Sequence, residues 1–298
     1  MSVVVAERLT KYYGRRVGID GLDLRIDAGT IFGFLGPNGS GKTTTIRLLM
    51  GFLRPDHGSV RMLGHDCWRH GPLARRDVGY VPGDIRLYPW LTARTAFRVF
   101  GQTRGLDLHA SGNRLAEEFR LEIDLPVRRM SRGTRQKLGL VLALAAEPRL
   151  LILDEPSSGL DPLVQDVLFR HLRGLAAAGH TVFFSTHTLS EVEDLCDRVA
   201  ILRAGKLLEH ASISDLRRRS ERNVTLRWKP GVQADKIEQP AFLSIRHAGA
   251  AEWAGSLVGP PGPFLQWCAA QPIENLAIGD SNLSSLFRKY YEAPEPDA

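Results

Sequence analysis

The chain has 298 residues, of which 43% are hydrophobic and 24% charged, and its formal net charge is +6. This composition is typical of one large globular domain, or of a large and a small one. No apolar run reaches the roughly 18 residues needed to cross a bilayer, and the first residues do not form a secretory signal. Three widely spaced cysteines fit a reducing compartment better than a disulfide framework. We therefore expect a cytoplasmic protein, whose positive charge permits nucleic acid, phosphate ligands or an anionic membrane surface as partners.

The first half of the chain changes from strand-like to helical patterns. Residues 3–35 contain three strand-like segments separated by turns, and the last runs into a glycine-rich loop. A helix is predicted from this loop to Phe52, where a turn rich in Pro, Asp and Gly follows. After another strand at 77–82, residues 92–146 show apolar positions at helical spacing. These patterns predict a helical subdomain over about 84–146.

Strands and helices alternate again in the next part of the chain. We predict a buried strand at 149–156, a helix at 162–178, a strand at 180–187, a short helix at 189–195 and a hairpin at 198–210. Continuous apolar strands that alternate with helices indicate a mostly parallel sheet covered on both faces. The fold class is therefore predicted to be α/β.

A domain boundary is predicted near residue 220. A helix at 212–219, with Ser212 as its N-cap, would close the first domain, 1–220. Residues 221–298 are then expected to form a small α+β C-terminal accessory domain.

Three features describe this C-terminal domain. Residues 223–228 alternate like a strand, and the Gly-Pro-rich segment 259–264 is expected to break the chain. A last helix would place Leu283, Leu286, Phe287 and Tyr290 on one face, before a frayed tail at 292–298.

The glycine-rich loop has the sequence GPNGSGKT, which fits the pattern of Gly, four free positions, Gly, Lys and Ser or Thr. Its glycines let backbone N–H groups surround a β-phosphate, while Lys42 can bridge the β- and γ-phosphates. The Thr43 hydroxyl can reach Mg²⁺. The predicted nucleotide-binding residues of the loop are Gly36, Pro37, Asn38, Gly39, Ser40, Gly41, Lys42 and Thr43.

Two acids end the predicted strand RLLILDEP. Asp154 can hold Mg²⁺ together with Thr43, and Glu155 is then placed to orient or deprotonate the attacking water. His187, at the end of another predicted strand, could bond the γ-phosphate. Glu155, His187 and Lys42 are the predicted catalytic residues. The alternative interpretations are ordinary strand-ending acids and a packed or capping histidine.

In the order GPNGSGKTT, MSRGT, LLILDEPSSGLDP and STH, these motifs resemble the nucleotide-binding subunit of ATP-binding cassette (ABC) transporters over about residues 3–220. The resemblance implies a phosphate-loop NTPase of ABC type, with a mixed sheet, an antiparallel β subdomain and a helical subdomain. It also implies that Tyr13 stacks on adenine, with Tyr12 as the alternative, and that Thr44 contacts a phosphate.

The segment MSRGT begins a predicted helix with Ser131 as its N-cap. Several cations surround this helix start, although a helix N-terminus disfavours positive charge. They are Arg128, Arg129, Arg132, Arg135 and Lys137. The resemblance implies that Ser131 and Gly133 contact the γ-phosphate of ATP held by another subunit, and that Asp161 serves contact between subunits. Arg132 either reaches that interface or faces water.

Because the chain has one phosphate loop and one such helix start, it cannot build two complete sites alone. A homodimer is the simplest closure, and pairing with a different cassette subunit is the alternative.

Two positions depart from the family pattern. The family usually has Gln, a metal and water contact, where this chain has Gly83, and Asp84 is a possible substitute. Where the family most often has LSGGQ, this chain has MSRGT, so that Arg132 and Thr134 replace Gly and Gln. Such charged signatures, the phrase LYPWLT and the ending NLSSLFRKYY resemble cassettes that serve drug, lipid or antibiotic exporters.

The leading hypothesis is an ATPase subunit that uses ATP and Mg²⁺ to drive export by a separate transmembrane subunit. It would lie on the inner face of the membrane, and a groove beside the helical insert, with the loop 83–91, would couple the two subunits. The alternative is a soluble ABC ATPase acting on nucleic acid or ribosomes, although nucleic acid is the less favoured partner. A third possibility is a cassette that barely hydrolyses ATP. Glu155 and His187 argue against it, whereas Gly83 keeps it open.

Overall fold

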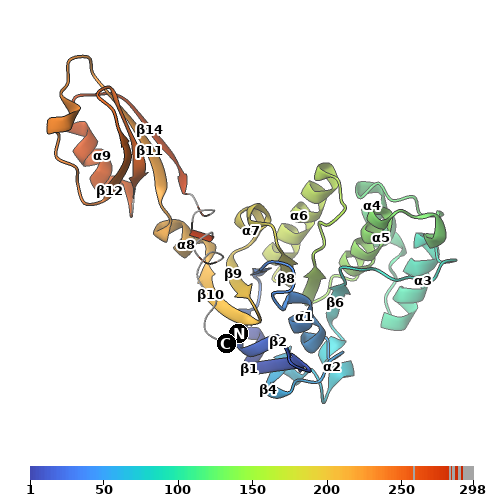
Figure 1. The fold of residues 1–298 in the computed structure, drawn as a ribbon. Helices are drawn as coiled ribbons and strands as arrows, with labels where there is room; N and C mark the ends of the chain where they lie inside the picture. Colours follow the sequence, from blue (N-terminus) through green and yellow to red (C-terminus); the bar gives the residue numbers. More distant parts are fainter. Residues whose placement is uncertain (258, 282, 284–285, 288–289, 291–298) are drawn as a thin grey trace. The chain divides into compact units, whose positions relative to one another are not determined.

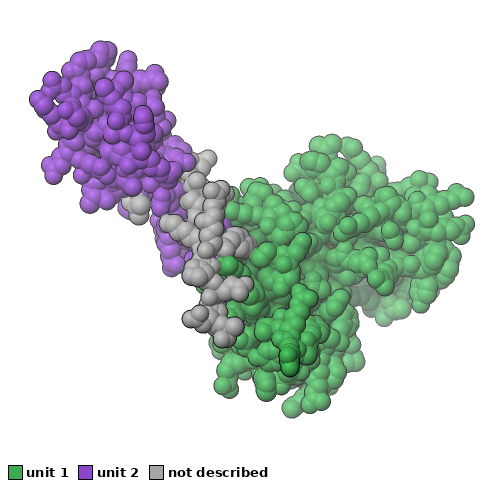
Figure 2. Space-filling model, in the orientation of Figure 1, with its two compact units in different colours: residues 1–210 green, residues 211–298 purple. Residues whose placement is uncertain are grey.

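Three β-sheets organise the residues that the computed structural model describes, which are 1–257, 259–281, 283, 286–287 and 290. The first two sheets belong to a unit of residues 1–210, except for the last two residues of β10, and the third sheet belongs to a unit of residues 211–298 (Figures 1 and 2). The division falls between His210 and Ala211. The assignment of domains to 1–220 and 221–298 stays a prediction.

The first sheet is antiparallel and has the strand order β2-β1-β4-β5. Its strands are β1 (Ser2–Tyr13), β2 (Arg16–Asp27), β4 (His57–Met62) and β5 (His65–Asp66). Gly14 turns the chain between β1 and β2 with a φ of 61°. This tight turn brings the end of β1, and with it Tyr13, next to the start of β2.

The second sheet has the order β10-β9-β3-β8-β7-β6, in which β9, β3, β8, β7 and β6 run parallel. Its strands are β3 (Ile31–Leu35), β6 (Val78–Val81), β7 (Leu150–Asp154), β8 (Thr181–Thr186), β9 (Arg198–Arg203) and β10 (Lys206–Ser212). Every residue of β3, β7 and β8 is buried, as expected for strands covered on both faces. The predicted α/β class with a parallel sheet is confirmed.

The helices of the first unit are α1 (Lys42–Leu49), α2 (Gly71–Arg75), α3 (Ala93–Arg104), α4 (His109–Glu118), α5 (Arg132–Ala145), α6 (Pro162–Ala177) and α7 (Leu189–Leu195). A short 3₁₀ turn, Val127–Arg129, precedes α5. The helices α3, α4 and α5 pack on one another and form a helical region beside the end of β6 (Figure 1). None of the described helices combines the length and apolar character that a membrane span requires.

The predicted end of α1 was wrong. The helix ends at Leu49 rather than Phe52, because Gly51 adopts a left-handed φ of 64°. The N–H of Phe52 then bonds back to the carbonyl oxygen of Arg47 at 2.8 Å and closes the last turn.

One apolar core joins the first two sheets to α1. It contains Ile19 and Leu22 of β2, Phe32 and Phe34 of β3, and Ile46 of α1. Because both ends of the loop 36–41 are anchored in this core, the loop is fixed at the edge of the sheet.

The second unit contains a four-stranded antiparallel sheet with the order β12-β13-β11-β14. Its elements are α8 (Ile213–Arg219), β11 (Arg222–Trp228), the 3₁₀ turn Ala234–Lys236, β12 (Leu243–Ala248), β13 (Glu252–Leu257), α9 (Pro261–Ala269) and β14 (Ile273–Ser281). The rings of Trp228 and Trp253 meet edge to face at 4.9 Å, in a core that also holds Phe264.

The sequence prediction for 259–264 was wrong, because α9 begins at Pro261 within this segment. Proline fits the first turn of a helix, where its missing N–H leaves no bond unmade. In the predicted last helix, Leu283, Leu286, Phe287 and Tyr290 are helical, and Leu283 and Phe287 are buried. The remaining positions of this helix and the tail 292–298 lie outside the described residues.

Candidate nucleotide site

The phosphate loop connects β3 to α1 and folds around its own lysine. Gly41, the N-cap of α1, has a φ of 109°, and a Cβ atom there would stand 2.5 Å from the Gly18 carbonyl oxygen. Lys42 is 4% exposed, and its ammonium group donates hydrogen bonds to the carbonyl oxygens of Gly36, at 2.7 Å, and Pro37, at 3.2 Å. The loop therefore presents a buried cation and the N-terminus of α1 to the same space.

Asp154, at the end of β7, accepts hydrogen bonds from two hydroxyl groups. Thr43 Oγ1 donates to Oδ2 at 3.1 Å, and Ser185 Oγ donates to Oδ1 at 2.7 Å. Burial raises the pKa of Asp154, and the bonds from Ser185 and Thr43 partly offset this rise. A carboxylate and a hydroxyl that converge beside the phosphate loop form an oxygen donor set that fits Mg²⁺, which usually takes few protein ligands and completes its shell with phosphate and water.

Glu155 is held in a left-handed backbone conformation, with a φ of 48°. Its N–H bonds to both the carbonyl and the hydroxyl oxygen of Ser185, each at 3.1 Å, which offsets the strain of that conformation. Its carboxylate lies between two cationic or proton-binding groups: Oε1 is 3.2 Å from Lys42 Nζ, and Oε2 is 3.4 Å from His187 Nδ1. The structure thus brings the three predicted catalytic residues into one cluster.

A cavity of about 360 Å³ opens onto this cluster. It is lined by Tyr13, Arg16, Val17, Gly18, Asn38, Gly39, Gly41, Lys42, Thr43, Thr44, Arg47 and Glu155. The Tyr13 hydroxyl lies 3.5 Å from Thr44 Oγ1. The Tyr12 hydroxyl instead donates to Asp20, in a separate groove, so that the structure places Tyr13 rather than Tyr12 at the nucleotide cavity.

The segment MSRGT is built separately from this cavity. Ser131 caps α5 by accepting a hydrogen bond from the Thr134 N–H at 3.1 Å. A Cβ atom on Gly133 would stand 2.6 Å from the Gly159 carbonyl oxygen, and the Arg132 guanidinium lies 3.4 Å from Ser158 Oγ.

Asp161 is also outside the cavity. It caps α6 through the Val164 N–H at 3.0 Å, and it faces Lys137 at 3.6 Å. The Val164 bond, followed by Lys137, lowers the pKa of Asp161. Among the described residues that line the cavity, none is Asp161 or belongs to the segment 130–134. One chain therefore collects the phosphate loop, Asp154, Glu155 and His187 but not the predicted γ-phosphate contacts Ser131 and Gly133.

Gly83 lies directly beside Asp154. A Cβ atom at Gly83 would stand 3.3 Å from the Asp154 carbonyl oxygen and 3.9 Å from Oδ2. The neighbouring Asp84 does not turn toward this point but pairs with Arg86 at 2.9 Å, where both side chains are largely exposed. At these two positions the loop after β6 thus contributes no side chain to the cluster around Asp154, because Gly83 has none and Asp84 pairs with Arg86.

Sequence reasoning missed several residues of the site. Ser185, which bonds both Asp154 and the Glu155 N–H, comes two positions before His187 in the strand motif, and that position was the available signal. Arg16 and Arg47 line the cavity without any motif to mark them. They add two cations to a cavity whose loop is already built for anions.

A phosphate loop, its buried lysine and a strand-end pair of carboxylates define a protein that binds a nucleoside triphosphate. Comparison with known proteins narrows this class: residues 19–158 match the ABC transporter family. The chain is 38% identical over 220 residues to the Nod factor export ATP-binding protein I of Paraburkholderia xenovorans, covering 72% of each chain. It is 40% identical over 216 residues to the protein of the same name in Sinorhizobium fredii, covering 70% of this chain and 63% of that one.

Solved structures agree with this assignment. The ATP-binding subunit of an ABC transporter matches with a TM-score of 0.67 and 31% identity, over 72% of this chain and 92% of that one. A bacterial Atm1-family ABC exporter with ATP bound matches with a TM-score of 0.63 and 26% identity, over 72% of this chain and 39% of that one. The chain belongs to the ATP-binding subunits of ABC transporters, which are ATPases.

Proposed function

We propose that this chain hydrolyses ATP with Mg²⁺ at the cavity beside Lys42, and that a dimer of such sites drives export through a separate membrane subunit. The observation that carries the proposal is the convergence of Thr43, Asp154 and Glu155 on the phosphate loop. The names of the relatives describe export of Nod factor, and they support the direction of transport rather than a particular substrate. The matches give no support to a soluble ATPase that acts on nucleic acid or ribosomes.

ATP would enter with its adenine at Tyr13 and its phosphates against the loop 36–43. The Lys42 ammonium then exchanges its partner Glu155 for phosphate oxygens, because the phosphates carry more negative charge than one carboxylate. This exchange frees Glu155 Oε1 at the moment when the γ-phosphate arrives.

Hydrolysis needs a base beside the γ-phosphate. Glu155 accepts a proton from water as the water oxygen bonds to the γ-phosphorus, and the bond from phosphorus to the β-bridging oxygen breaks, to give ADP and phosphate. His187, 3.4 Å from Glu155, holds this carboxylate and can itself bond the γ-phosphate. When bound by Thr43 and Asp154, Mg²⁺ would neutralise phosphate charge.

A second chain would supply what the cavity lacks. Ser131 and Gly133 present a capped helix start, and Arg132 adds a cation, but they do not line the cavity of their own chain. In a two-fold symmetric pair each helix start would face the partner's γ-phosphate. The pair would be isologous, so that both sites close together. A different cassette subunit is the alternative partner.

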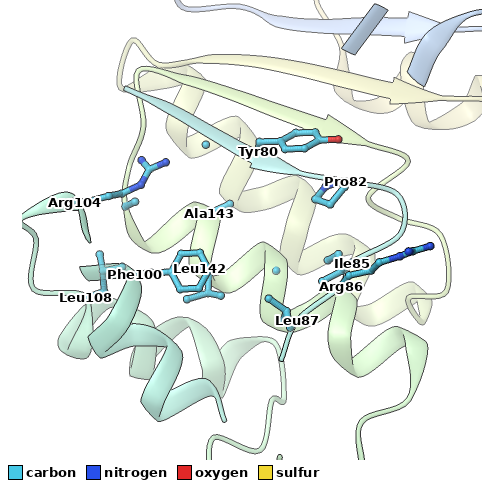
Figure 3. Close-up of a pocket in the computed structure, with 13 residues that line it drawn as sticks. Tyr80, Pro82, Ile85, Arg86, Leu87, Phe100, Arg104, Leu108, Leu142 and Ala143 are labelled. Carbon is cyan, nitrogen blue, oxygen red and sulfur yellow. The ribbon is translucent and has the colours of Figure 1, made fainter. Parts of the chain in front are cut away.

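The surface for the membrane subunit would be a groove of about 220 Å³ between the loop after β6 and the helical region (Figure 3). The lining of this groove is mostly apolar and includes Leu87, Phe100, Leu108 and Leu142. A helical segment with an apolar face fits such a groove. This contact would hold the chain on the cytoplasmic face of the membrane.

The test is to purify the tagged chain from a detergent extract of membranes and identify what comes with it. We expect an integral membrane subunit, and ATP turnover that changes when that subunit is present. A Glu155→Gln complex prepared in the same way controls for contaminating ATPases. If the chain never associates with membranes or with a membrane subunit, the proposed function is wrong.

A further inference from the structure

The loop after β6, residues 83–87, runs from the nucleotide site to the groove but has no side chain that reaches Asp154. Gly83 lies at the Asp154 end, and Asp84 pairs with Arg86 at the surface. Ile85, Arg86 and Leu87 line the groove at the other end (Figure 3). Gly139 of α5 lines the same groove. A movement of this loop is therefore not passed to Asp154, the predicted metal ligand, through a side chain of the loop.

The same loop packs tightly against α5 through Ile85. Ile85 is only 8% exposed, and its Cδ1 atom occupies the space where a Cβ atom on Gly139 would stand. The Ile85 Cγ1 atom lies 3.5 Å from that point, and Val81 Cγ1 lies 3.7 Å from it. Gly139 thus forms a notch in α5 that is filled by one side chain of the loop.

The helix α5 connects this notch with the segment MSRGT. It begins at Arg132, is capped by Ser131 and continues through Gly139 to Ala145 without interruption. Rigid secondary-structure elements can carry coupling between sites, and the backbone hydrogen bonds of an α-helix run along its axis. Loop and helix start are therefore linked by one buried contact and one rigid element.

We propose that Ile85 in the notch of Gly139 passes the state of the groove to the helix start at Ser131, so that in this chain coupling acts on the γ-phosphate contacts rather than on the metal ligand. The proposal rests on the proposed function, because it requires a membrane subunit in the groove. Ile85 is in this account a positioning residue, not a catalytic one.

The contact between Ile85 and Gly139 can be tested by moving side-chain volume from one position to the other. Ile85→Ala removes both atoms that fill the notch, whereas Gly139→Ala adds a methyl group that Ile85 must avoid. In the double variant the methyl group added at position 139 enters the space that the isoleucine side chain has left. Gly174→Ala is the matched control, since a Cβ atom at Gly174 in α6 meets nothing within 4 Å.

The readout is the ratio of ATP turnover in the complex with the membrane subunit to turnover of the free chain, which normalises for each variant's own basal rate. We expect each single variant to move this ratio toward one by about 2- to 30-fold, the range of measured coupling changes. The double variant should lie closer to the wild type than either single variant. Melting temperatures of all variants separate loss of coupling from loss of fold.

Two results overturn the proposal: both single variants keep the wild-type ratio, or their effects simply add in the double variant. If the wild-type ratio is itself one, the proposed function fails, and this inference fails with it. A wild-type ratio that differs from one, with unchanged variants, removes only the role of Ile85.

Discussion

The strands β6 and β7 are parallel neighbours that end at the same edge of the six-stranded sheet, and the residues that follow them differ in kind. At the end of β7 the chain presents Asp154 and then Glu155, which contact Thr43, Ser185, Lys42 and His187. After β6 it presents Gly83, the exposed Asp84 paired with Arg86, and the buried Ile85. Polar contacts therefore fix the residues at the end of β7, and apolar packing fixes the residues that follow β6.

The ends of β7 and β6 are neighbours in the sheet, but their residues suit two different tasks. The end of β7 holds the groups that can position a metal ion and a water molecule, which are the requirements of hydrolysis. The end of β6 leads to the groove, which is the surface proposed for the membrane subunit. Substitutions at the two ends should accordingly change different quantities.

Glu155→Gln tests the β7 end most strongly. The amide keeps the shape of the side chain but cannot accept the proton, so ATP turnover should fall by roughly 10²- to 10⁴-fold. Binding of ATP should persist. Phosphate release and equilibrium binding of a labelled ATP, measured on the same preparation, check both statements. Turnover equal to that of the wild type would show that Glu155 is not the base.

Lys42→Ala should weaken ATP binding itself. Loss of a hydrogen bond to a charged group costs about 1.5–3 kcal/mol, which corresponds to roughly a 10- to 150-fold higher dissociation constant. Lys11→Ala is a suitable control, since Lys11 pairs with Asp56 outside the cavity. An unchanged affinity in Lys42→Ala would remove this lysine from the phosphate site.

The β7 end was more predictable from the sequence than the surrounding site. Lys42, Thr43, Asp154 and Glu155 lie in short contiguous motifs whose chemistry depends on local spacing. The role of Ser185 depends on the register that sets it opposite Asp154 in parallel strands, and a single sequence does not reveal that register.

The second unit was less predictable for a different reason. The short strands of this unit have weak periodicity in their sequence, and β11 is the one of these strands that the sequence predicted. In α9 a Gly-Pro-rich start hides a helix, because the residues that usually break helices are accepted in a first turn. The boundary of α1 was missed because Gly51 ends the helix inside an apolar run that continues to Leu53.

Gly83→Gln tests whether the β6 end can be brought into the chemistry. Its Cβ atom would stand 3.9 Å from Asp154 Oδ2, so the amide oxygen could join Asp154 in holding a Mg²⁺ ion. We expect the Mg²⁺ concentration for half-maximal ATPase activity to fall by up to about ten-fold, the worth of one added polar contact. No change in the Mg²⁺ dependence or in ATPase activity would mean that the site does not need that side chain.

Arg132→Gly should have the smallest effect. An exposed pair of a cation and a phosphate contributes about 0.2–1 kcal/mol, or at most roughly a 5-fold change in ATPase activity, and this contribution should weaken with salt. Arg132→Lys retains the charge and serves as the control. If Arg132→Gly leaves both the activity and its salt dependence unchanged, the guanidinium serves only its contact with Ser158.

The most direct test of the account is the mass of the Glu155→Gln chain in solution with ATP and Mg²⁺, measured by light scattering. Ser131 and Gly133 do not line the cavity of their own chain. In the proposed homodimer a second copy would supply them, and slow hydrolysis should preserve the pair. We predict twice the 33.0 kDa mass of one chain with ATP, and one chain without it. A single-chain mass in the presence of bound ATP would contradict the proposal that two copies complete the site.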